Sequence, residues 1–405
     1  MKILILCNKP PYPALEGGPM AMNSIVTGML EAGHQVKLLS VNNSKYNVSM
    51  DDIPKEYQQL TGIELIDVDL RVKPFQAFKN LFSKKSYHVE RFISNNFTNR
   101  LVEILKADTY DMVQLETLFM TPYLETIRQY SKAPIVLRAH NVEHLIWERI
   151  AKGTRFFLKR AYIKHLTKTL KNYELNVISQ VDGIAAITRK DAAFFRKYCA
   201  TPTIDIPFGV YPEQFTPNYE IESKPKFYHI GSMNWMPNEE GIRWFIDDCM
   251  DDVLKKTPDF VFHLAGRHMP EWLQNLKNPH VDVVGEVPNA KEFVANHDVA
   301  IVPLLSGSGI RIKIIESMAM GKTVITTQIG AEGILYDEDI NVIIAENKAK
   351  MAEAIRRINE DPALAVEIGK AARKLVEEVY DNRKIIERLL LFYQQIKPSS
   401  KITFI

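Results

Sequence analysis

The chain has 405 residues, of which 46% are hydrophobic and 25% charged, a composition typical of a globular protein with about two domains. Its 51 basic and 49 acidic residues nearly cancel, which excludes a chain-wide basic surface, so we expect no nucleic-acid partner. Three widely separated cysteines predict a reducing compartment without a disulfide framework, and no apolar run reaches the roughly 18 residues of a membrane-spanning helix. We therefore expect a cytoplasmic location.

Short apolar runs rich in Val, Ile and Leu alternate with helical patterns along the chain. Such continuous runs are typical of strands that are buried on both faces of a parallel sheet. Strands that alternate with helices predict an α/β fold. The first series of candidate strands lies at 2–7, 35–41, 63–70, 111–115, 134–139 and 183–187, and the second at 226–231, 260–266, 281–285, 299–304, 323–327 and 341–345.

A proline-rich stretch, IDIPFGVYPEQFTPN at 204–218, separates the two series and is interpreted as a linker. We therefore predict two doubly wound, Rossmann-like domains, at 1–205 and 206–380, that face each other across a cleft. A helical pattern at 382–396 predicts that the last segment, 381–405, forms a helix that packs back on the N-terminal domain. In such sheets, ligands bind at the carboxyl ends of the strands.

The stretch GSGIRIKIIESMAMGKTVITT at 307–327 looks like two phosphate-binding motifs but satisfies neither. A P-loop needs a glycine where Glu316 stands, and it needs the order strand, loop, helix, whereas Gly321 and its Lys-Thr follow a helical pattern. A dinucleotide-binding turn needs its third glycine where Ile312 stands. Neither a P-loop nor a nicotinamide site is therefore predicted.

The same stretch predicts a loop of small residues that opens a helix running from about Ile310 to Met320. The first-turn amides and the dipole of such a helix favour an anion, and Arg311 and Lys313 add two positive charges there. Glu316 lies about one turn deeper, where its carboxylate can accept two hydrogen bonds from a ribose diol. Phosphate and ribose together indicate a nucleotide, and an ordinary surface helix is the alternative.

Five segments, taken in order along the chain, resemble one family. The last is similar to the C-terminal signature of GT-B glycosyltransferases of the retaining family-4 type, the glycosyl transferases group 1. The resemblance extends over essentially the whole chain. The segments are EAGHQVKLLS (31–40), IPFGVYPEQF (206–215), GSMNWMPNEEG (231–241), LAGR (264–267) and SGIRIKIIESMAMGKTVITTQIGAEGI (308–334).

The resemblance implies a GT-B fold and a retaining glycosyltransferase of hexosyltransferase type. Such an enzyme moves a sugar from a nucleotide-diphosphate sugar to a hydroxyl of a glycan or a lipid-linked acceptor, in cell-surface polysaccharide or glycolipid synthesis. Cations and a helix dipole aimed at the departing diphosphate would stabilise its charge, so we expect no cofactor and no metal. A nucleotide-sugar 2-epimerase of the same fold and a non-catalytic nucleotide-sugar binder are the alternatives.

The resemblance also implies that the C-terminal half binds the donor. Glu316 matches the glutamate that binds the ribose, whereas Ser308 stands where the family has a glutamate that contacts the donor sugar. Ser232 stands where many relatives have an arginine for the diphosphate, and we assign that role, with its catalytic effect, to Arg311 and Lys313. The other expected donor-binding residues are Gly231, Arg267, Gly307, Gly309 and Ile310.

The N-terminal half is expected to carry the acceptor. By the resemblance, His140, just after the fifth predicted strand, faces the transferred sugar and acts in catalysis, with Asn141 beside it as an acceptor contact. Gly17 and Gly18 follow the first strand and open a helix, where backbone amides can approach a ligand. Glu116 follows the fourth predicted strand and is expected to point into the cleft as an acceptor contact.

Two short patterns look like metal sites, and we predict that neither is one. Asp-Val-Asp at 67–69 lies inside a predicted strand. HNVEH at 140–144 fits a zinc-protease pattern, but His140 is expected at a strand end, off the helical face that such a site requires.

Two basic stretches make an anionic membrane surface a candidate partner. Residues 151–171 contain seven Lys or Arg and no acid, with an apolar stripe broad enough for a helix. Residues 73–85 place three phenylalanines beside four lysines. Basic amphipathic helices can lie on anionic lipid, which predicts peripheral attachment at the inner membrane face. The alternative is that the apolar faces pack onto the domain.

Overall fold

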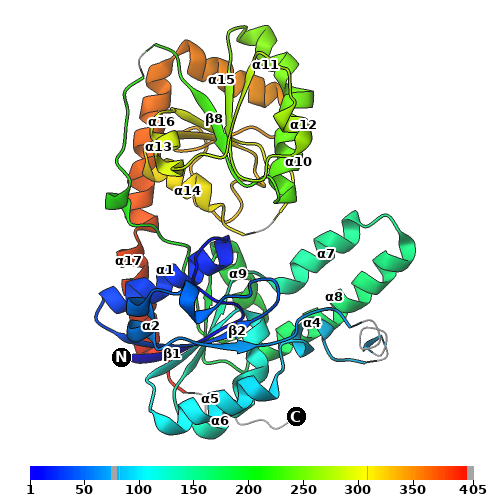
Figure 1. The fold of residues 1–405 in the computed structure, drawn as a ribbon, viewed down its shortest axis with the longest axis vertical. Coiled ribbons are helices and arrows are strands. Elements are labelled where there is room, and N and C mark those ends of the chain that lie inside the picture. The colour runs from blue at the N-terminus through cyan, green and yellow to red at the C-terminus, as the bar shows by residue number, and fades with distance from the viewer. Residues whose placement is uncertain (74–79, 82, 222, 308, 399–405) are drawn as a thin grey trace. The chain divides into compact units, whose positions relative to one another are not determined.

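The structure, a computed structural model, describes residues 1–405 except 74–79, 82, 222, 308 and 399–405 (Figure 1). The chain divides into two compact units, one made of Met1–Phe208 with Ile385–Ile405 and the other of Gly209–Lys384. Each unit has one parallel sheet with helices around it, which confirms the predicted α/β class of two Rossmann-like domains.

The first unit is built on a seven-stranded sheet in the order β3-β2-β1-β4-β5-β6-β7. Its strands are β1 Lys2–Cys7, β2 Gln35–Asn42, β3 Glu64–Asp67, β4 Met112–Glu116, β5 Ile135–Ala139, β6 Gly183–Ala186 and β7 Thr203–Asp205. Its helices include α1 Gly17–Glu31, α2 Lys55–Thr61, α4 Tyr87–Glu90, α5 Asn95–Ala107, α6 Leu124–Tyr130, α7 Glu143–Gly153, α8 Phe157–Val177, α9 Arg189–Tyr198 and α17 Asn382–Gln395.

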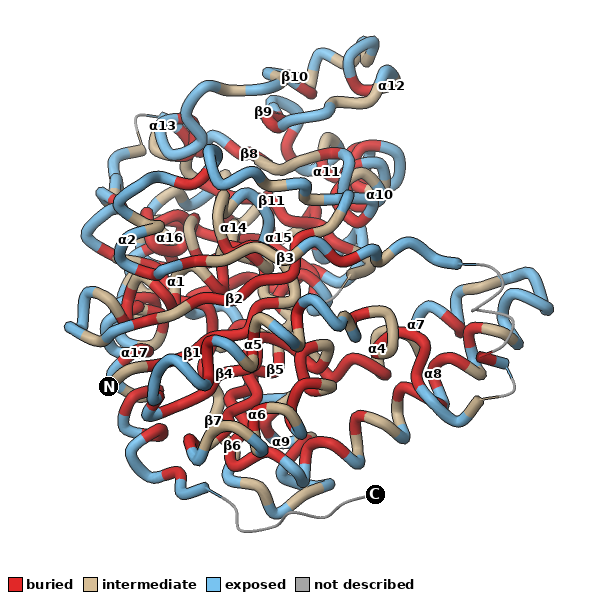
Figure 2. The backbone as a smooth tube through the Cα atoms, turned by 60° about the horizontal axis from the view of Figure 1, so that its bottom comes forward, coloured by how far each residue is buried: buried red, intermediate tan, exposed pale blue. Residues whose placement is uncertain are grey.

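Side chains of β1 alternate between two apolar clusters, which explains why this run is apolar throughout. Leu4 and Leu6 belong to one cluster, whereas Ile3, Ile5 and Cys7 belong to the other. Successive side chains of a strand point to opposite faces, so both faces of the sheet are covered. Figure 2 shows β1, β4 and β5 as buried tubes in the middle of the unit.

Helix α17 returns to the first unit, as predicted for the C-terminal segment. Its apolar residues Ile385, Leu389 and Phe392 lie in the same buried cluster as Ile3 and Ile5 of β1. A methyl group at Gly183 would lie 3.0 Å from the Phe392 ring, so the helix packs directly on β6.

The second unit is built on a six-stranded parallel sheet in the order β10-β9-β8-β11-β12-β13. Its strands are β8 Phe227–Ile230, β9 Phe262–Ala265, β10 Val281–Gly285, β11 Val299–Val302, β12 Thr323–Thr326 and β13 Ile343–Ile344. Its helices include α10 Met236–Trp244, α11 Met250–Lys256, α12 Glu271–Gln274, α13 Ala290–Ala295, α14 Ile312–Ala319, α15 Lys348–Glu360 and α16 Pro362–Leu375.

Three local predictions need correction. The expected strand at 63–70 ends at Asp67, because Asp69 accepts hydrogen bonds from Arg71 in a turn. The expected linker at 204–218 begins inside β7, whose Ile204 pairs with Ala185. The basic stretch at 151–171 is not one helix, because the chain leaves the helical path between Gly153 and Phe157.

The other basic stretch, 73–85, lies largely outside the described residues. None of the helices within the described ranges combines the length and apolar character that crossing a membrane requires.

Candidate functional site

In the second unit, a loop wraps around one buried arginine where β11 leads into α14. Arg311 caps the helix and is 4% exposed, and its Nη1 donates to the carbonyl oxygen of Gly309 over 2.8 Å. Its guanidinium also lies 5.2 Å from the centre of the Trp235 ring. Gly307 has φ +107°, and a methyl group there would come within 2.9 Å of the Arg311 side chain, so only glycine fits.

This loop changes the predicted start of the helix. The helix begins at Ile312, not near Ile310, because Arg311 has an extended backbone and turns its side chain back into the loop. Gly309 also has a left-handed φ of +84°, and Ile310 lies between it and the cap. Ser308 lies outside the described residues. Arg311 therefore shapes the loop that was expected to approach an anion.

Lys313 points from the first turn of α14 toward the end of β8. Its Nζ donates to Asn238 Oδ1 over 2.7 Å and lies 3.1 Å from His229 Nε2. His229 Nδ1 is 2.8 Å from the carbonyl oxygen of Ile301, so Nδ1 carries the proton and Nε2 accepts from the ammonium. Burial, together with the charge of Arg311, lowers the pKa of Lys313 to about 7. No described carboxylate pairs with this ammonium, so an anionic ligand would stabilise its charged form.

Glu316, one turn further along α14, is a carboxylate without a partner among the described residues. It is half-buried, and burial raises its pKa to about 7 even though Lys291 acts in the opposite direction. A carboxylate that has lost water without gaining donors is destabilised. Donor hydroxyls from a ligand would relieve that cost, as expected for a ribose site.

Two glycines let the loops after β8 and β9 meet close to Lys313. A methyl group at Gly231 would lie 2.7 Å from Lys313 Nζ, and one at Gly266 would lie 1.8 Å from the carbonyl oxygen of Gly231. Ser232 is tied into the same turn, because its carbonyl oxygen accepts from Asn238 Nδ2 over 2.8 Å. The structure thus brings Gly231, Ser232 and Lys313 together, as expected for a donor site.

Arg267 contributes differently from the expectation. Its carbonyl oxygen accepts from the backbone N–H of Met233 over 2.9 Å, which joins the two loops. Its side chain is exposed and makes no hydrogen bond or ion pair with a described residue. The guanidinium therefore lies beside the turn, and no described residue holds it in one position.

In the first unit, His140 follows β5 directly, as predicted, and belongs to a buried polar chain. Its Nε2 lies 2.5 Å from Glu116 Oε2, and Arg138 Nη1 lies 3.2 Å from the same ring nitrogen. Burial lowers the pKa of His140, and Glu116 opposes that effect. Within the described residues only Nε2 is engaged, which leaves Nδ1 for a ligand.

Glu116 itself is placed differently from the expected acceptor contact. It ends β4 with no exposed surface, and Gln114 Nε2 donates to its second oxygen over 2.5 Å. Gln114 in turn accepts from the hydroxyl of Tyr393 on α17. Burial alone would raise the pKa of Glu116, but Arg138 and His140 bring it below its ordinary value. The carboxylate is therefore held against His140 inside the unit, by contacts with Arg138 and His140 at the end of the neighbouring strand β5, and is not exposed as an acceptor contact would be.

The segment after His140 carries a second buried chain. The carboxylate of Glu143 accepts from the side chain of Asn141, and burial together with Glu174 raises the pKa of Glu143 to about 8. His144 Nδ1 lies 2.5 Å from Glu174 Oε2. The two histidines of HNVEH thus face different carboxylates and do not converge on one metal.

The other pattern that resembles a metal site is also occupied by hydrogen bonds. Asp67 accepts from Asn42 Nδ2 over 2.9 Å, whereas Asp69 pairs with Arg71. Within the described ranges, no group of three or more His, Cys, Asp or Glu side chains is arranged to hold a metal ion.

Gly17 and Gly18 open α1 as predicted, and a lysine lies against Gly18. A methyl group at Gly18 would come within 2.8 Å of Lys9 Nζ. Lys9 Nζ donates to the hydroxyl of Tyr46 over 3.1 Å, and Tyr46 donates to Glu16 over 3.0 Å. The glycine therefore makes room for an ammonium that forms no ion pair with a described carboxylate.

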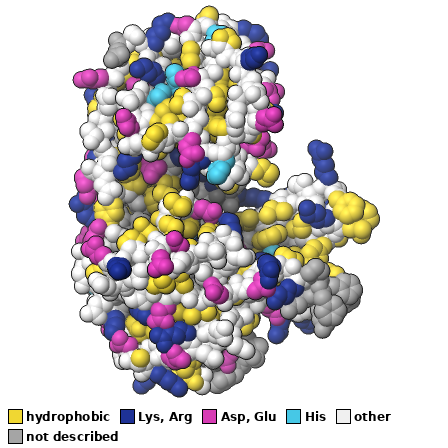
Figure 3. All heavy atoms as spheres, viewed as in Figure 1, with side chains coloured by type: hydrophobic (Ala, Val, Ile, Leu, Met, Phe, Trp, Pro, Cys, Tyr) yellow, Lys and Arg dark blue, Asp and Glu magenta, His cyan; other side chains and the backbone are white. Residues whose placement is uncertain are grey.

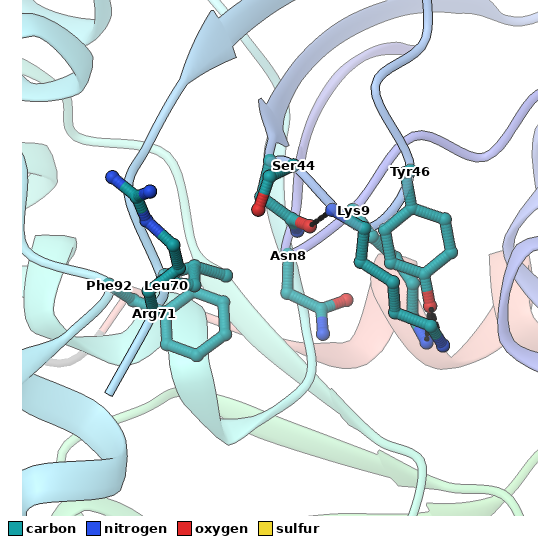
Figure 4. A pocket seen from close by; sticks show the side chains of 9 residues that line it. Asn8, Lys9, Ser44, Tyr46, Leu70, Arg71 and Phe92 are labelled. Carbon is teal, nitrogen blue, oxygen red and sulfur yellow. Dashed lines mark hydrogen bonds between the residues drawn. The ribbon is translucent and has the colours of Figure 1, made fainter.

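Lys9 also lines a pocket of about 390 Å³ at the carboxyl ends of β1, β2 and β3. Figure 4 shows Lys9 and Tyr46 joined on one side, with Leu70 and Phe92 on the other and Asn8 between them. The full lining is Asn8, Lys9, Asn43, Ser44, Lys45, Tyr46, Leu70, Arg71 and Phe92. The polar and basic lining suits a hydroxyl-rich or anionic ligand.

Known proteins resemble this chain in sequence and in fold. Residues 224–361 match the family described as Glycosyl transferases group 1. They span β8 to α15, including Lys313 and Glu316. The match lies within the second unit and relates that unit to glycosyl transferases.

Similar proteins cover the chain from end to end. An uncharacterized 44.6 kDa protein in the cps region of Klebsiella pneumoniae is 22% identical, over 96% of this chain and 98% of its own length. Anabaena HepE in complex with UDP has a TM-score of 0.68 at 13% identity, with 98% and 100% of the two chains covered. Staphylococcus aureus TarM, in a complex that includes UDP and α-GlcNAc-glycerol, has a TM-score of 0.65 at 14% identity, with the same coverage. The whole chain therefore has the GT-B fold of these solved structures.

Sequence reasoning missed two groups of residues, one in each unit. The only sequence signal for His229 is that a histidine interrupts an otherwise apolar strand. Asn8, Lys9 and Tyr46 follow β1 and β2, and polar residues directly after a buried strand are a usable signal.

Proposed function

We propose that this chain is a retaining glycosyltransferase of hexosyltransferase type that uses a nucleotide-diphosphate sugar as donor. The observation that carries the proposal is the pairing, on one helix, of Lys313 and Glu316. Among the described residues, Lys313 has no carboxylate partner and Glu316 has no hydrogen-bonded partner, and the pKa of each is shifted to about 7. A cation for a diphosphate and an acceptor for a ribose diol are what a nucleotide requires.

Catalysis would depend on the departing diphosphate. As the bond between the sugar C1 and the diphosphate oxygen breaks, negative charge accumulates on that oxygen. Lys313 and the loop held by Arg311 are positioned to stabilise this charge, which is the main electrostatic contribution in such reactions. The acceptor hydroxyl bonds to C1 on the same face, and its proton passes to the departing diphosphate oxygen. We propose that no metal and no cofactor are needed, since these side chains supply the positive charge.

The first unit would serve the sugar and the acceptor. We assign His140 Nδ1 to the transferred sugar, with Glu116 as a positioning residue that fixes the ring through Nε2. The acceptor is assigned to the pocket that Lys9 and Tyr46 line, where their side chains can hydrogen-bond hydroxyls or an anionic group; Gly18 leaves room for Lys9 there. Asn141, whose side chain bonds to Glu143, is assigned as a further acceptor contact.

The relatives support a role in cell-surface polysaccharide or glycolipid synthesis. The Klebsiella relative is a protein of a cps region, and the two solved structures hold UDP. UDP is therefore the first nucleotide to test, and a hydroxyl of a glycan or lipid-linked acceptor at the inner membrane face is the acceptor class.

A thermal-shift screen against UDP, GDP, ADP and dTDP tests donor binding directly. We expect one nucleotide to raise Tm, and Glu316→Ala to remove most of that shift. NMR of the product then tests retention, because an inverted anomer would contradict it. Turnover of the donor without any acceptor would favour a 2-epimerase, and binding without turnover with any acceptor a non-catalytic binder.

A further inference from the structure

The end of the α7–α8 hairpin is an apolar tip, defined here as Phe156, Phe157 and Leu158. These side chains are 61%, 70% and 58% exposed. Within the described part of the chain, no other three consecutive large apolar residues are all exposed. Figures 1 and 2 show α7 and α8 leaving the sheet of the first unit side by side and ending in this tip.

A collar of basic residues surrounds the tip. Figure 3 shows hydrophobic and basic side chains together on the projecting end of the hairpin. No acidic residue occurs between Ala151 and Lys171, and the basic residues next to the tip form no ion pair with a described residue. These basic residues, all exposed, are Lys152, Arg155, Lys159, Arg160 and Lys164.

The base of the hairpin is fixed, so the tip is held away from the body of the unit. Glu174 of α8 accepts from the backbone N–H of Glu143 over 2.9 Å and contacts the His144 ring on α7. The Trp147 ring lies 4.0 Å from the His88 ring of α4. Further along α8, the apolar residues nearer the base, Ile163, Leu166 and Leu170, are buried. The apolar stripe thus packs onto the unit at its base and is uncovered only at its end.

We propose that this tip inserts into an anionic lipid surface. An apolar wedge ringed by Lys and Arg, without acids, matches the headgroup and acyl boundary of such a membrane. The surface of one aromatic side chain is roughly 150–250 Å², so the tip exposes on the order of 350 Å² of apolar surface in all. Each partner in a stable protein interface buries roughly 800 Å², which is well above that area. Charge and area together therefore favour lipid over a protein partner or a second copy.

Insertion would place the first-unit site near the membrane. Helix α7 has 11 residues and joins His140 to the tip, which corresponds to about 16 Å. A headgroup-linked acceptor would then lie near His140. This consequence rests on the proposed function, whereas lipid binding does not.

Vesicle flotation tests the proposal with the full chain. We expect wild type to float with vesicles of phosphatidylcholine and phosphatidylglycerol and to remain behind with phosphatidylcholine alone, with binding weakened by salt. The triple variant Phe156→Ser, Phe157→Ser, Leu158→Ser should lose at least tenfold in partitioning while keeping its Tm, because more than half of each of these side chains is exposed. Ile340→Ser is the matched control, since Ile340 is 61% exposed on the second unit.

A second measurement reports insertion itself. In Phe157→Trp, the added fluorescence should shift to shorter wavelength on anionic vesicles and be quenched by brominated acyl chains. The proposal is overturned if wild type ignores anionic vesicles, if the triple variant floats like wild type, or if the tryptophan is not quenched. A nucleotide thermal shift on the same samples reports separately on the donor site, so failure of one proposal is not mistaken for failure of the other.

Discussion

The pH dependence of donor affinity is the sharpest test of the paired residues on α14. In the free protein the pKa of Glu316 is raised to about 7, so its binding-competent carboxylate is lost as pH falls through 7. The pKa of Lys313 is lowered to about 7, so its binding-competent ammonium is lost as pH rises through 7. A ligand that needs both charges therefore binds best near neutral pH.

The size of the effect follows from the two titrations. With both pKa values at about 7, roughly a quarter of molecules carry both charges at pH 7 and about 8% do so at pH 6 or pH 8, so affinity should fall about threefold on either side. Glu316→Gln removes the acidic limb, and affinity should then fall about tenfold between pH 6 and pH 8. Lys313→Met removes the basic limb, and affinity should instead rise about tenfold over the same interval.

Isothermal titration calorimetry at pH 6, 7 and 8 measures these profiles. The ligand should be the sugar ester of the nucleotide with the largest thermal shift, because its phosphates do not titrate in this range. At pH 8, Glu316→Gln should also bind roughly 10- to 150-fold more weakly, the loss of a hydrogen bond to a charged group of about 1.5–3 kcal/mol. Glu271→Gln, on exposed α12, is the control. Identical pH profiles for wild type and both variants would refute the assignment of these two residues.

Three further predictions concern the loops, the polar chain and the hairpin base. In Gly266→Ala, the new methyl group would clash with the Gly231 carbonyl oxygen at a residue whose φ is +152°. We expect the free energy of unfolding to fall by about 1–3 kcal/mol and the nucleotide thermal shift to be lost. An unchanged melting curve would contradict the close approach of the two loops. Glu116→Gln keeps a hydrogen bond to His140 but removes the charge, so kcat should fall about tenfold with little change in donor KM; a change in KM alone would argue against a positioning role. Glu174→Ala leaves His144 buried without its partner and should cost about 3–5 kcal/mol in urea unfolding, whereas Glu148→Ala, from an exposed pair of 3.8 Å, should cost less than about 1 kcal/mol; equal losses would contradict the contrast in burial.

Much of the candidate donor site could be predicted from the sequence, because it lies in one short segment. Gly307, Lys313 and Glu316 occur within a single loop and helix, so their spacing places them on one element whatever surrounds it. The start of that helix was misplaced, since Arg311 carries a charge typical of an exposed first turn. Its burial against Trp235, from a different loop, is not encoded in the local pattern.

In the first unit, too, the position of a residue could be predicted from the sequence and its contacts could not. The position of His140 at a strand end followed from the apolar run before it. The role of Glu116 did not, because a carboxylate at the end of a strand can face either solvent or a neighbouring strand. Burial between β4 and β5, beside Arg138, decided it.

The sequence by itself determined what depends on near neighbours in the chain: the two series of buried strands, the glycine turns and the helix that presents Lys313 and Glu316. Only the tertiary structure decided which distant groups meet. Lys313 meets His229 across 84 positions, and Tyr393 reaches Gln114 across 279. Such contacts set protonation and orientation through burial and hydrogen bonding, and these are properties of the packed surroundings that a linear pattern of residue types does not contain.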